Sequence, residues 1–151
     1  MEIQNVIGVC GSHNSGKTTL IVEVIKRLKK DGYKVATIKS IPREFSIDKK
    51  GKDTWKHGDA GADAVVALSE NETALILKRG MKLERVLEIL NEVIEPDLIL
   101  LEGKKKERRI PKIVVGDLNV DDAFRYDGNF EELIDWIKSL LVSSDRSSPY
   151  G

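Results

Sequence analysis

The spacing of apolar residues predicts strands that alternate with helices along the first two thirds of the chain. An apolar run at 6–10 indicates a strand, and apolar positions recur at helical spacing over 16–31. The segment 33–39 indicates a second strand, parallel to the first because a helix connects the two. A continuous apolar run at 98–101 is typical of a parallel strand that is covered on both faces.

The remaining patterns complete the expected fold. Short apolar runs at 64–68 and 73–77 predict two strands, as a buried hairpin or as an edge extension of the sheet. Helical spacing returns at 83–94 and at 130–141, and 113–115 indicates a further short strand. The alternation predicts an α/β fold, a three-layer αβα domain with a mostly parallel sheet and a β-hairpin extension.

Two segments interrupt this regular pattern. The polar, aperiodic stretch 41–61 predicts a long loop, and loops of this length are usually functional or disordered. The serine-rich segment 143–151 predicts a disordered tail. The remaining residues, 1–142, are few enough for one domain and many enough to bury a core.

Composition narrows the class of protein. Lysine plus arginine equals aspartate plus glutamate, 25 each, so net charge does not favour nucleic acid or an anionic membrane as a partner. Cys10 is the only cysteine and forms no internal disulfide, as expected in a reducing compartment. No apolar run reaches the length of a membrane span, and the first residues carry no signal pattern. We therefore expect a cytoplasmic protein.

The most specific motif stands between the first predicted strand and the first predicted helix. It consists of Gly11, Ser12, His13, Asn14, Ser15, Gly16, Lys17 and Thr18, with Thr19 continuing into the helix. This is the G-x-x-x-x-G-K-[ST] pattern, in which backbone N–H groups surround phosphates. Lys17 can then reach the β- and γ-phosphates, and the Thr18 hydroxyl can bind Mg²⁺. The context predicts a nucleoside triphosphate site on a P-loop NTPase fold.

Such a site needs a carboxylate near the metal. Asp97 and Glu102 flank the apolar run 98–101, and ligands gather at the carboxyl ends of strands, which favours Glu102. Aspartate is usual here, so Glu102 either reaches Mg²⁺ through water or polarises the attacking water. Asp48, in a D-x-x-G pattern within the long loop, is a second candidate for metal binding and catalysis, or else a turn-forming residue.

Two further groups of residues have candidate roles. The basic cluster Lys104, Lys105, Lys106, Arg108, Arg109 and Lys112 follows Glu102. It serves either as a clamp for a phosphate-bearing molecule or acidic partner, or as a solvated loop. Asp117 follows the strand at 113–115, where a carboxylate could accept hydrogen bonds from the N1–H and amine of guanine. The usual guanine motif N-K-x-D is absent.

Three stretches together carry a family resemblance. They are the phosphate loop with Thr19-Leu20, the strand 35–39 with the following 45–54 and 60–62, and the segments 100–103 and 111–113. The second stretch contains I-D-x-x-G-K-D-[ST] followed by A-G-A, which is far more specific than the loop alone. Over residues 6–115 the chain resembles the molybdopterin-guanine dinucleotide biosynthesis protein B (MobB) family.

The resemblance implies a GTP-binding, weakly hydrolysing homodimer whose sheet is shared or extended between subunits, while the phosphate loop itself implies Mg²⁺ as cofactor. It also implies an accessory role beside the guanylyltransferase that attaches GMP to molybdopterin, with molybdopterin itself as a further candidate ligand. The family often carries histidines in a K-H-x-H-H pattern after the second strand, whereas this chain has Lys39-Ser40-Ile41-Pro42-Arg43. Roles that depend on those histidines therefore do not transfer.

Two other functions are compatible with the same residues. A small-molecule kinase would use the basic loop 104–112 as a lid and Asp48 as a base, and would phosphorylate an acceptor rapidly. An adaptor would present a nucleotide or a pterin to its partner without hydrolysis. Any hydrolysis would be slow, because no arginine finger can be assigned in the chain.

Overall fold

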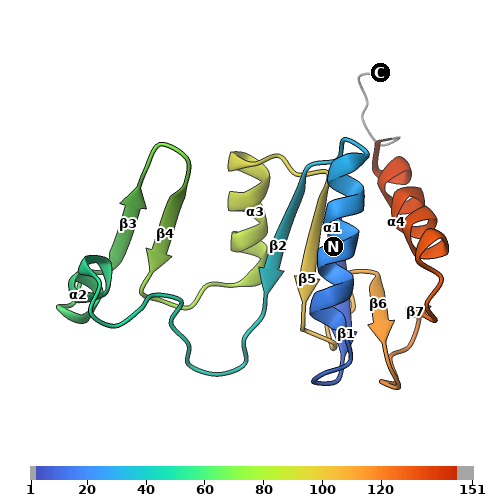
Figure 1. Cartoon of the computed structure of the whole chain (residues 1–151), viewed down its shortest axis with the longest axis horizontal. Coiled ribbons are helices and arrows are strands. Elements are labelled where there is room, and N and C mark those ends of the chain that lie inside the picture. Colours follow the sequence, from blue (N-terminus) through green and yellow to red (C-terminus); the bar gives the residue numbers. More distant parts are fainter. Residues whose placement is uncertain (1–2, 146–151) are drawn as a thin grey trace. The chain divides into compact units, whose positions relative to one another are not determined.

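The computed structural model describes residues 3–145 and divides into two compact units. The first unit combines the chain up to Ser40 with the chain from Leu90 onward, and the second is Ile41–Ile89. Figure 1 shows the order of the elements, with the sheet and two long helices in the first unit and a separate hairpin in the second.

The first unit is built on a five-stranded sheet in the order β2-β5-β1-β6-β7. Its strands are β1 (Val6–Gly11), β2 (Val35–Lys39), β5 (Leu98–Glu102), β6 (Lys112–Val115) and β7 (Phe124–Tyr126). All neighbouring strands pair in parallel. The predicted α/β fold with a mostly parallel sheet is confirmed, whereas the short strand β7 was not predicted.

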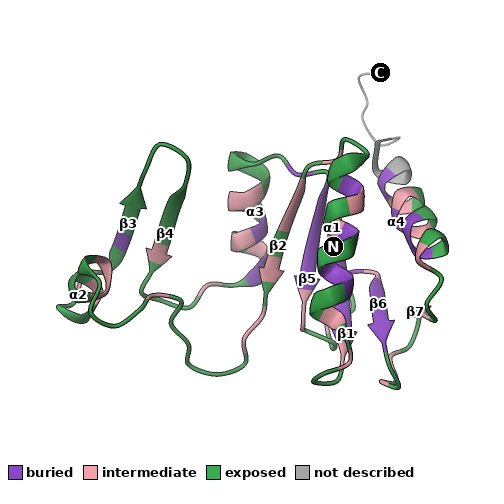
Figure 2. Cartoon of the chain, viewed as in Figure 1, coloured by how far each residue is buried: buried purple, intermediate pink, exposed green. Residues whose placement is uncertain are grey.

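One face of this sheet forms the main core with the helices α1 (Lys17–Lys30) and α4 (Phe130–Asp145). Alternate residues of the central strands, such as Ile7 and Leu100, pack there. Residues between them, such as Leu101, are also fully buried, so β5 is covered on both faces as its continuous apolar sequence predicts. Figure 2 shows the buried residues concentrated in β1, β5 and β6, with further buried segments along the helices.

Local signals in the sequence set the ends of the two long helices. After α1, Gly32 adopts φ +90°, and the N–H of Tyr33 donates to the Leu28 carbonyl at 2.9 Å. Before α4, the Asn129 side-chain oxygen accepts from the N–H of Glu132 at 3.1 Å, as expected of an N-cap. Both ends are where the sequence predicts them.

The second unit contains α2 (Asp53–Asp59), the antiparallel pair β3 (Ala64–Leu68) and β4 (Thr73–Leu77), and the start of α3 (Leu83–Val93). The predicted hairpin is present, but as a separate two-stranded sheet and not as an extension of the central one. It is also largely exposed, with only Val65 buried among its strand residues. The expectation of a buried or edge-extending hairpin is therefore wrong, because apolar alternation reveals a strand but not its pairing partner.

Two segments that the sequence predicts to be irregular contain helical residues in the structure. The long loop 41–61 contains a short helix, α2, which brief helical spacing without a capping hydrogen bond does not reveal. Helix α4 continues to Asp145, so residues 143–145 of the expected tail are helical, and the rest of that tail lies outside the described residues. None of the helices formed by the described residues combines the length and apolar character needed to cross a membrane.

Candidate nucleotide-binding site

The segment between β1 and α1 forms a tight loop that ends directly on the helix N-terminus. Gly16 caps α1 in the left-handed conformation, with φ 92° and ψ 13°, and Asn14 also has a positive φ, 59°. The N–H of Ser15 donates to the Ser12 carbonyl at 3.2 Å and closes a turn within the loop. A glycine is favoured at Gly16 because other residues are strained at this φ.

Gly11 is required by close packing. A Cβ atom at this position would lie 2.6 Å from the Ser15 hydroxyl oxygen and 2.7 Å from the backbone oxygen of Val115. The loop thus folds back against the end of β1 and β6 with no room for a side chain. The same packing buries the Ser15 hydroxyl, which has no hydrogen-bond partner among the described residues.

The loop presents unpaired donors on its inner side. Within residues 3–145, no acceptor is paired with the backbone N–H groups of Gly16, Lys17 or Thr18. The Lys17 ammonium reaches back across the loop and donates to the Gly11 carbonyl at 2.8 Å. Free amides, a helix N-terminus and an ammonium group converge here, an arrangement that suits a polyphosphate.

Glu102 lies at the same edge of the sheet as the loop. The strand register pairs it with Val9 of β1 and with Lys39 of β2. Its carboxylate is 3.9 Å from the Lys39 ammonium, and its side chain is 17% exposed. Gly103 follows with φ +102°, where a Cβ would come within 3.2 Å of the Ser40 oxygen. The chain therefore turns tightly after Glu102 and leaves the carboxylate at the strand end.

Asp97 is at the opposite end of β5 and has a structural role. Its carboxylate accepts from the N–H of Lys34 at 2.7 Å, where the chain enters β2. This agrees with the geometric preference for Glu102 over Asp97. In a parallel sheet all strands end at one edge, so the residue that precedes β5 lies far from the phosphate loop.

The residues at this edge fit a magnesium ion bound together with phosphates. The part of the chain with described coordinates contains no group of three or more His, Cys, Asp or Glu side chains that could hold a metal alone. Mg²⁺ is typically held by one or two protein oxygens plus phosphate and water. Thr18, exposed in the first turn of α1, and Glu102 supply oxygens of that kind.

The basic loop after Glu102 divides into two parts. Arg109 donates three hydrogen bonds to the Glu107 carboxylate, from Nε and Nη2 at 2.8 Å each and from its backbone N–H at 3.0 Å, and these bonds lower the pKa of Glu107 to about 2. The residue Lys112 is only 7% exposed, and its ammonium donates to the Glu107 backbone carbonyl. Arg109 and Lys112 therefore stabilise the loop itself, which favours the structural interpretation for these two residues.

The other lysines of this loop face solvent. Lys104, Lys105 and Lys106 are exposed and, with Glu107, line a shallow cavity of about 460 Å³. The neighbouring Cys10 thiol lies 3.7 Å from the Gly103 carbonyl. Burial raises the pKa of this thiol, and the positive charges of Lys112, Lys17 and Lys105 lower it by a smaller amount. These exposed lysines remain available for an anionic ligand.

Several predicted residues lie elsewhere. Asp48 belongs to the second unit, where its carboxylate accepts from the adjacent N–H of Lys49 at 2.9 Å, a local turn contact. Its role at the metal stays a prediction. His13 and Thr19 are exposed on the phosphate loop and α1, and Asp117 is exposed just after β6.

One residue beside the site escapes sequence reasoning. Arg125 of β7 donates to the carbonyls of Gly116 and Leu118, at 2.6 and 2.8 Å, and so fixes the loop that contains Asp117. The sequence offers no clear signal for it, because β7 has only three residues and no apolar run.

Comparison with known proteins supplies a family. The profile of the family described as Molybdopterin guanine dinucleotide synthesis protein B matches residues 6–137. The chain is 41% identical over 113 residues to a Methanocaldococcus jannaschii protein named as a candidate molybdopterin-guanine dinucleotide biosynthesis adapter protein. It is 31% identical over 112 residues to the Haemophilus influenzae protein named as an adapter of the same biosynthesis.

These matches extend over 73% of this chain, but over 46% and 62% of the two relatives. The chain thus spans about half the length of the curated relatives it matches. The crystal structure of Bacillus subtilis MobB superposes with a TM-score of 0.72 at 23% identity, covering 90% of this chain and 97% of that one. That similarity establishes a shared fold.

Proposed function

Because this chain belongs to the molybdopterin guanine dinucleotide synthesis protein B family, we propose that it acts as a GTP-binding adapter in molybdenum cofactor maturation. In this role it assists the attachment of GMP to molybdopterin by a partner guanylyltransferase. The observation that carries the proposal is the loop at 11–18, with its free amides and the Lys17 ammonium at the start of α1. The names of the relatives support a role in molybdopterin-guanine dinucleotide biosynthesis, and the geometry of the loop supports a nucleoside triphosphate as ligand.

The residues of the first unit would divide the binding of a triphosphate among them. The amides of Gly16, Lys17 and Thr18 donate to phosphate oxygens, as free N–H groups at a helix N-terminus do. On binding, the Lys17 ammonium exchanges its bond to the Gly11 carbonyl for the β- and γ-oxygens. Thr18 and Glu102 would hold Mg²⁺, which supplies positive charge beside these oxygens.

We expect hydrolysis at this site to be slow. Water would attack the γ-phosphorus in line, and catalysis would consist of positioning and charge stabilisation. Lys17 stabilises the developing negative charge, and Glu102 either positions the metal or orients the water. Among residues 3–145 no arginine is assigned to the transition state, so rapid turnover would need a residue from a partner.

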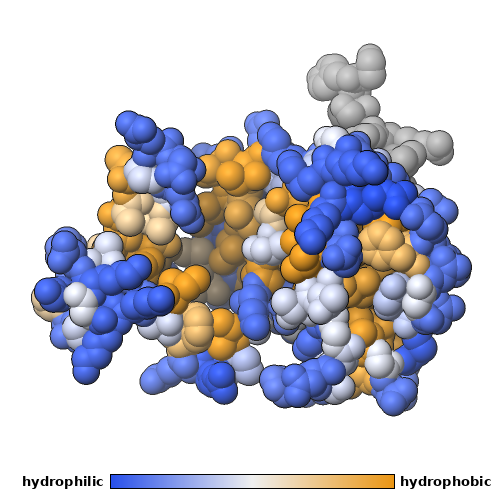
Figure 3. All heavy atoms as spheres, viewed as in Figure 1, coloured by the Kyte–Doolittle hydropathy of each residue, from blue (hydrophilic) through white to orange (hydrophobic). Residues whose placement is uncertain are grey.

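A homodimer would use the exposed hairpin of the second unit. Val66, Leu68 and Leu75 lie on one face of β3 and β4 and are 54%, 81% and 57% exposed. Figure 3 shows apolar surface over the hairpin, with hydrophilic side chains around it. Apolar patches of this kind usually mark an interaction surface. A second copy of the chain, which presents the same face, is the occupant we propose.

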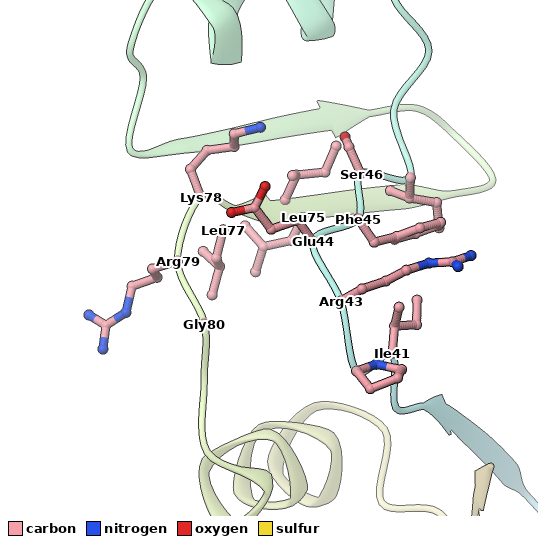
Figure 4. A pocket seen from close by; sticks show the side chains of 13 residues that line it. Ile41, Arg43, Glu44, Phe45, Ser46, Leu75, Leu77, Lys78, Arg79 and Gly80 are labelled. Carbon is pink, nitrogen blue, oxygen red and sulfur yellow. The ribbon is translucent and has the colours of Figure 1, made fainter. Parts of the chain in front are cut away.

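A cavity of about 1080 Å³ in the same unit continues this surface. It lies between the segment 41–47 and the end of β4, with Phe45 and Leu77 in its lining. Figure 4 shows Leu75 and Leu77 directed toward that segment while the Arg79 side chain points away. Its apolar lining adds to the area that a protein partner could cover.

Titration of the purified protein with GTP, ATP and molybdopterin, with and without Mg²⁺, tests the proposed function. We expect GTP to raise the melting temperature in a Mg²⁺-dependent way, because a ligand that binds only the folded state stabilises it. Lys17→Ala should abolish this shift. Lys30→Ala, an exposed lysine at the other end of α1, is the matched control and should retain it.

The outcomes separate the alternatives. An unchanged GTP shift in the Lys17→Ala variant would refute the site. Rapid phosphorylation of an added acceptor with ATP would identify a kinase instead. Binding of GTP without any single-turnover hydrolysis would favour the non-hydrolysing alternative, in which the protein only presents its nucleotide to a partner.

A further inference from the structure

The loop that follows β6 begins directly against the phosphate loop. Val115, the last residue of β6, pairs with Gly11 in the strand register. The next residue, Gly116, has φ +80°, and a Cβ placed there would lie 3.5 Å from the Ser15 Cβ. The two loops therefore share a wall formed by the Ser15 side chain, whose buried hydroxyl has no partner in the described part of the chain.

Arg125 fixes the loop 116–119 from its other side. It stands on β7 opposite Val114. Its Nη1 donates to the Gly116 carbonyl at 2.6 Å and its Nη2 donates to the Leu118 carbonyl at 2.8 Å. A planar guanidinium can bridge two acceptors in this way, and a single ammonium cannot hold both in the same fixed geometry. The bridge orders the backbone around Asp117, whose own side chain is exposed.

The sheet order indicates what this loop faces. β1 has two neighbours, β5 on one side and β6 on the other. Glu102 ends β5, so the metal and the terminal phosphate belong to that side of the phosphate loop. The nucleoside end of a bound triphosphate is then left for the β6 side, where the loop 116–119 lies.

Resting on the proposed nucleotide-binding function, we propose that Arg125 is a positioning residue that holds the loop 116–119 as the base-reading segment of the site. The Asp117 carboxylate accepts hydrogen bonds from the N1–H and the exocyclic amine of a guanine base. Inosine lacks that amine, and adenine offers no such pair of donors. The ligand class is therefore a guanosine nucleotide, with selectivity that depends on the order of this loop.

Binding measurements with four ligands test the inference. Dissociation constants for inorganic tripolyphosphate, ATP, ITP and GTP, each with Mg²⁺, are determined by calorimetry for the wild-type protein and for Arg125→Ala, Arg125→Lys and Asp117→Ala. Arg79→Ala, which removes an exposed arginine of the second unit, is the matched control. Tripolyphosphate reports on the phosphate loop alone, and the GTP-to-ITP ratio reports on the base.

We expect Arg125→Ala and Asp117→Ala to reduce the preference for GTP over ITP by about tenfold, as expected for the loss of the one hydrogen bond from the exocyclic amine to a charged acceptor. Tripolyphosphate affinity should stay unchanged, and Arg125→Lys should restore little of the preference. Arg79→Ala should behave as the wild type.

Two results would overturn the inference. An unchanged GTP-to-ITP ratio in Arg125→Ala would show that the loop does not read the base. An equal loss of affinity for all four ligands would assign Arg125 to general stability. Failure of the wild-type protein to bind tripolyphosphate or any nucleotide is a distinct outcome, which would refute the proposed function and this inference with it.

Discussion

At the scale of single residues, the phosphate loop requires glycine at two positions, each for a different physical reason. Gly11 allows the Ser15 side chain and the Val115 carbonyl to meet where a Cβ would stand. A serine hydroxyl can rotate away, but a backbone carbonyl in β6 cannot move without disturbing the strand pair. The first glycine of the motif is thus constrained by packing, whereas Gly16 is constrained by its positive φ.

Gly11→Ala should therefore lower the free energy of unfolding by about 1–3 kcal/mol, the range typical of overpacked sites. Urea denaturation measures this change. Gly80→Ala is the control, because no heavy atom lies within 4 Å of the Cβ position at Gly80. The control should change stability by less than about 1 kcal/mol in either direction. Equal stability of the two variants would contradict the packing argument.

The lowered pKa of the Glu107 carboxyl group predicts that part of the free energy of unfolding is lost in acid. Its pKa falls from 4.5 to about 2 in the folded state, chiefly through hydrogen bonds from the Arg109 side chain. A lowered carboxyl pKa gives stability that is present above pH 4.5 and is lost as the pH falls toward 2. We expect Glu107→Gln to lose up to about 1 kcal/mol at pH 7, since the pair lies near the surface.

The measurement for Glu107 is the unfolding free energy as a function of pH. The difference between wild type and Glu107→Gln should shrink through the acidic range and vanish near its lower end. Glu88→Gln is a control on α3, where Arg85 and the exposed Glu88 pair at 2.7 Å. A constant difference at every pH would show that the Glu107 effect is not electrostatic.

At the scale of elements, the sequence predicts the helices and strands whose own residues show a clear apolar pattern. The apolar spacing of α1 and of α4 and the continuous run of β5 act locally or through burial, and all three elements form as predicted. Helix α2 and strand β7 are short and have weak patterns, so nothing local distinguishes them from loops. The hairpin is visible in the sequence, but its separation from the central sheet depends on pairing that alternation does not encode.

The residues of the candidate site also differ in whether the sequence predicts their roles. The phosphate loop and Glu102 follow from a motif and from the rule that parallel strands end at one edge. The internal pairing of Arg109 and Lys112 with Glu107 could not be predicted, because a run of cations looks alike whether it is solvated or folded onto itself. Arg125 could not be predicted either, since its role depends on two backbone carbonyls.

The hairpin provides a prediction at this scale. Leu75→Glu places a charge in the exposed apolar face of β4 and should convert the proposed dimer to a monomer, because burying an unpaired charge is strongly unfavourable. Sedimentation equilibrium measures the oligomeric state. Asn71→Glu, in the turn between the strands, is the matched control and should leave it unchanged. A wild-type protein that stays monomeric at high concentration would contradict the proposal.

At the scale of the whole molecule, stability is distributed unevenly between the two units. The strands β1, β5 and β6 of the first unit are almost entirely buried, and Leu98, Ile99, Leu101 and Val114 have no exposed surface. In the hairpin, only Val65 is buried. Because local opening is easiest where few apolar groups are buried, the two units should differ in the free energy of opening.

Native-state hydrogen exchange should resolve this difference. Amides of β1, β5 and β6 should exchange only through global unfolding, whereas those of β3 and β4 should exchange at a lower free energy in dilute protein. If a second copy covers the hairpin, protection of β3 and β4 should rise with protein concentration in the wild type but not in Leu75→Glu. GTP at a hundredfold excess over its dissociation constant should add about 2.7 kcal/mol to the opening of β1, β5 and β6. Hairpin protection equal to that of β1 at every concentration would contradict both the uneven burial and the dimer.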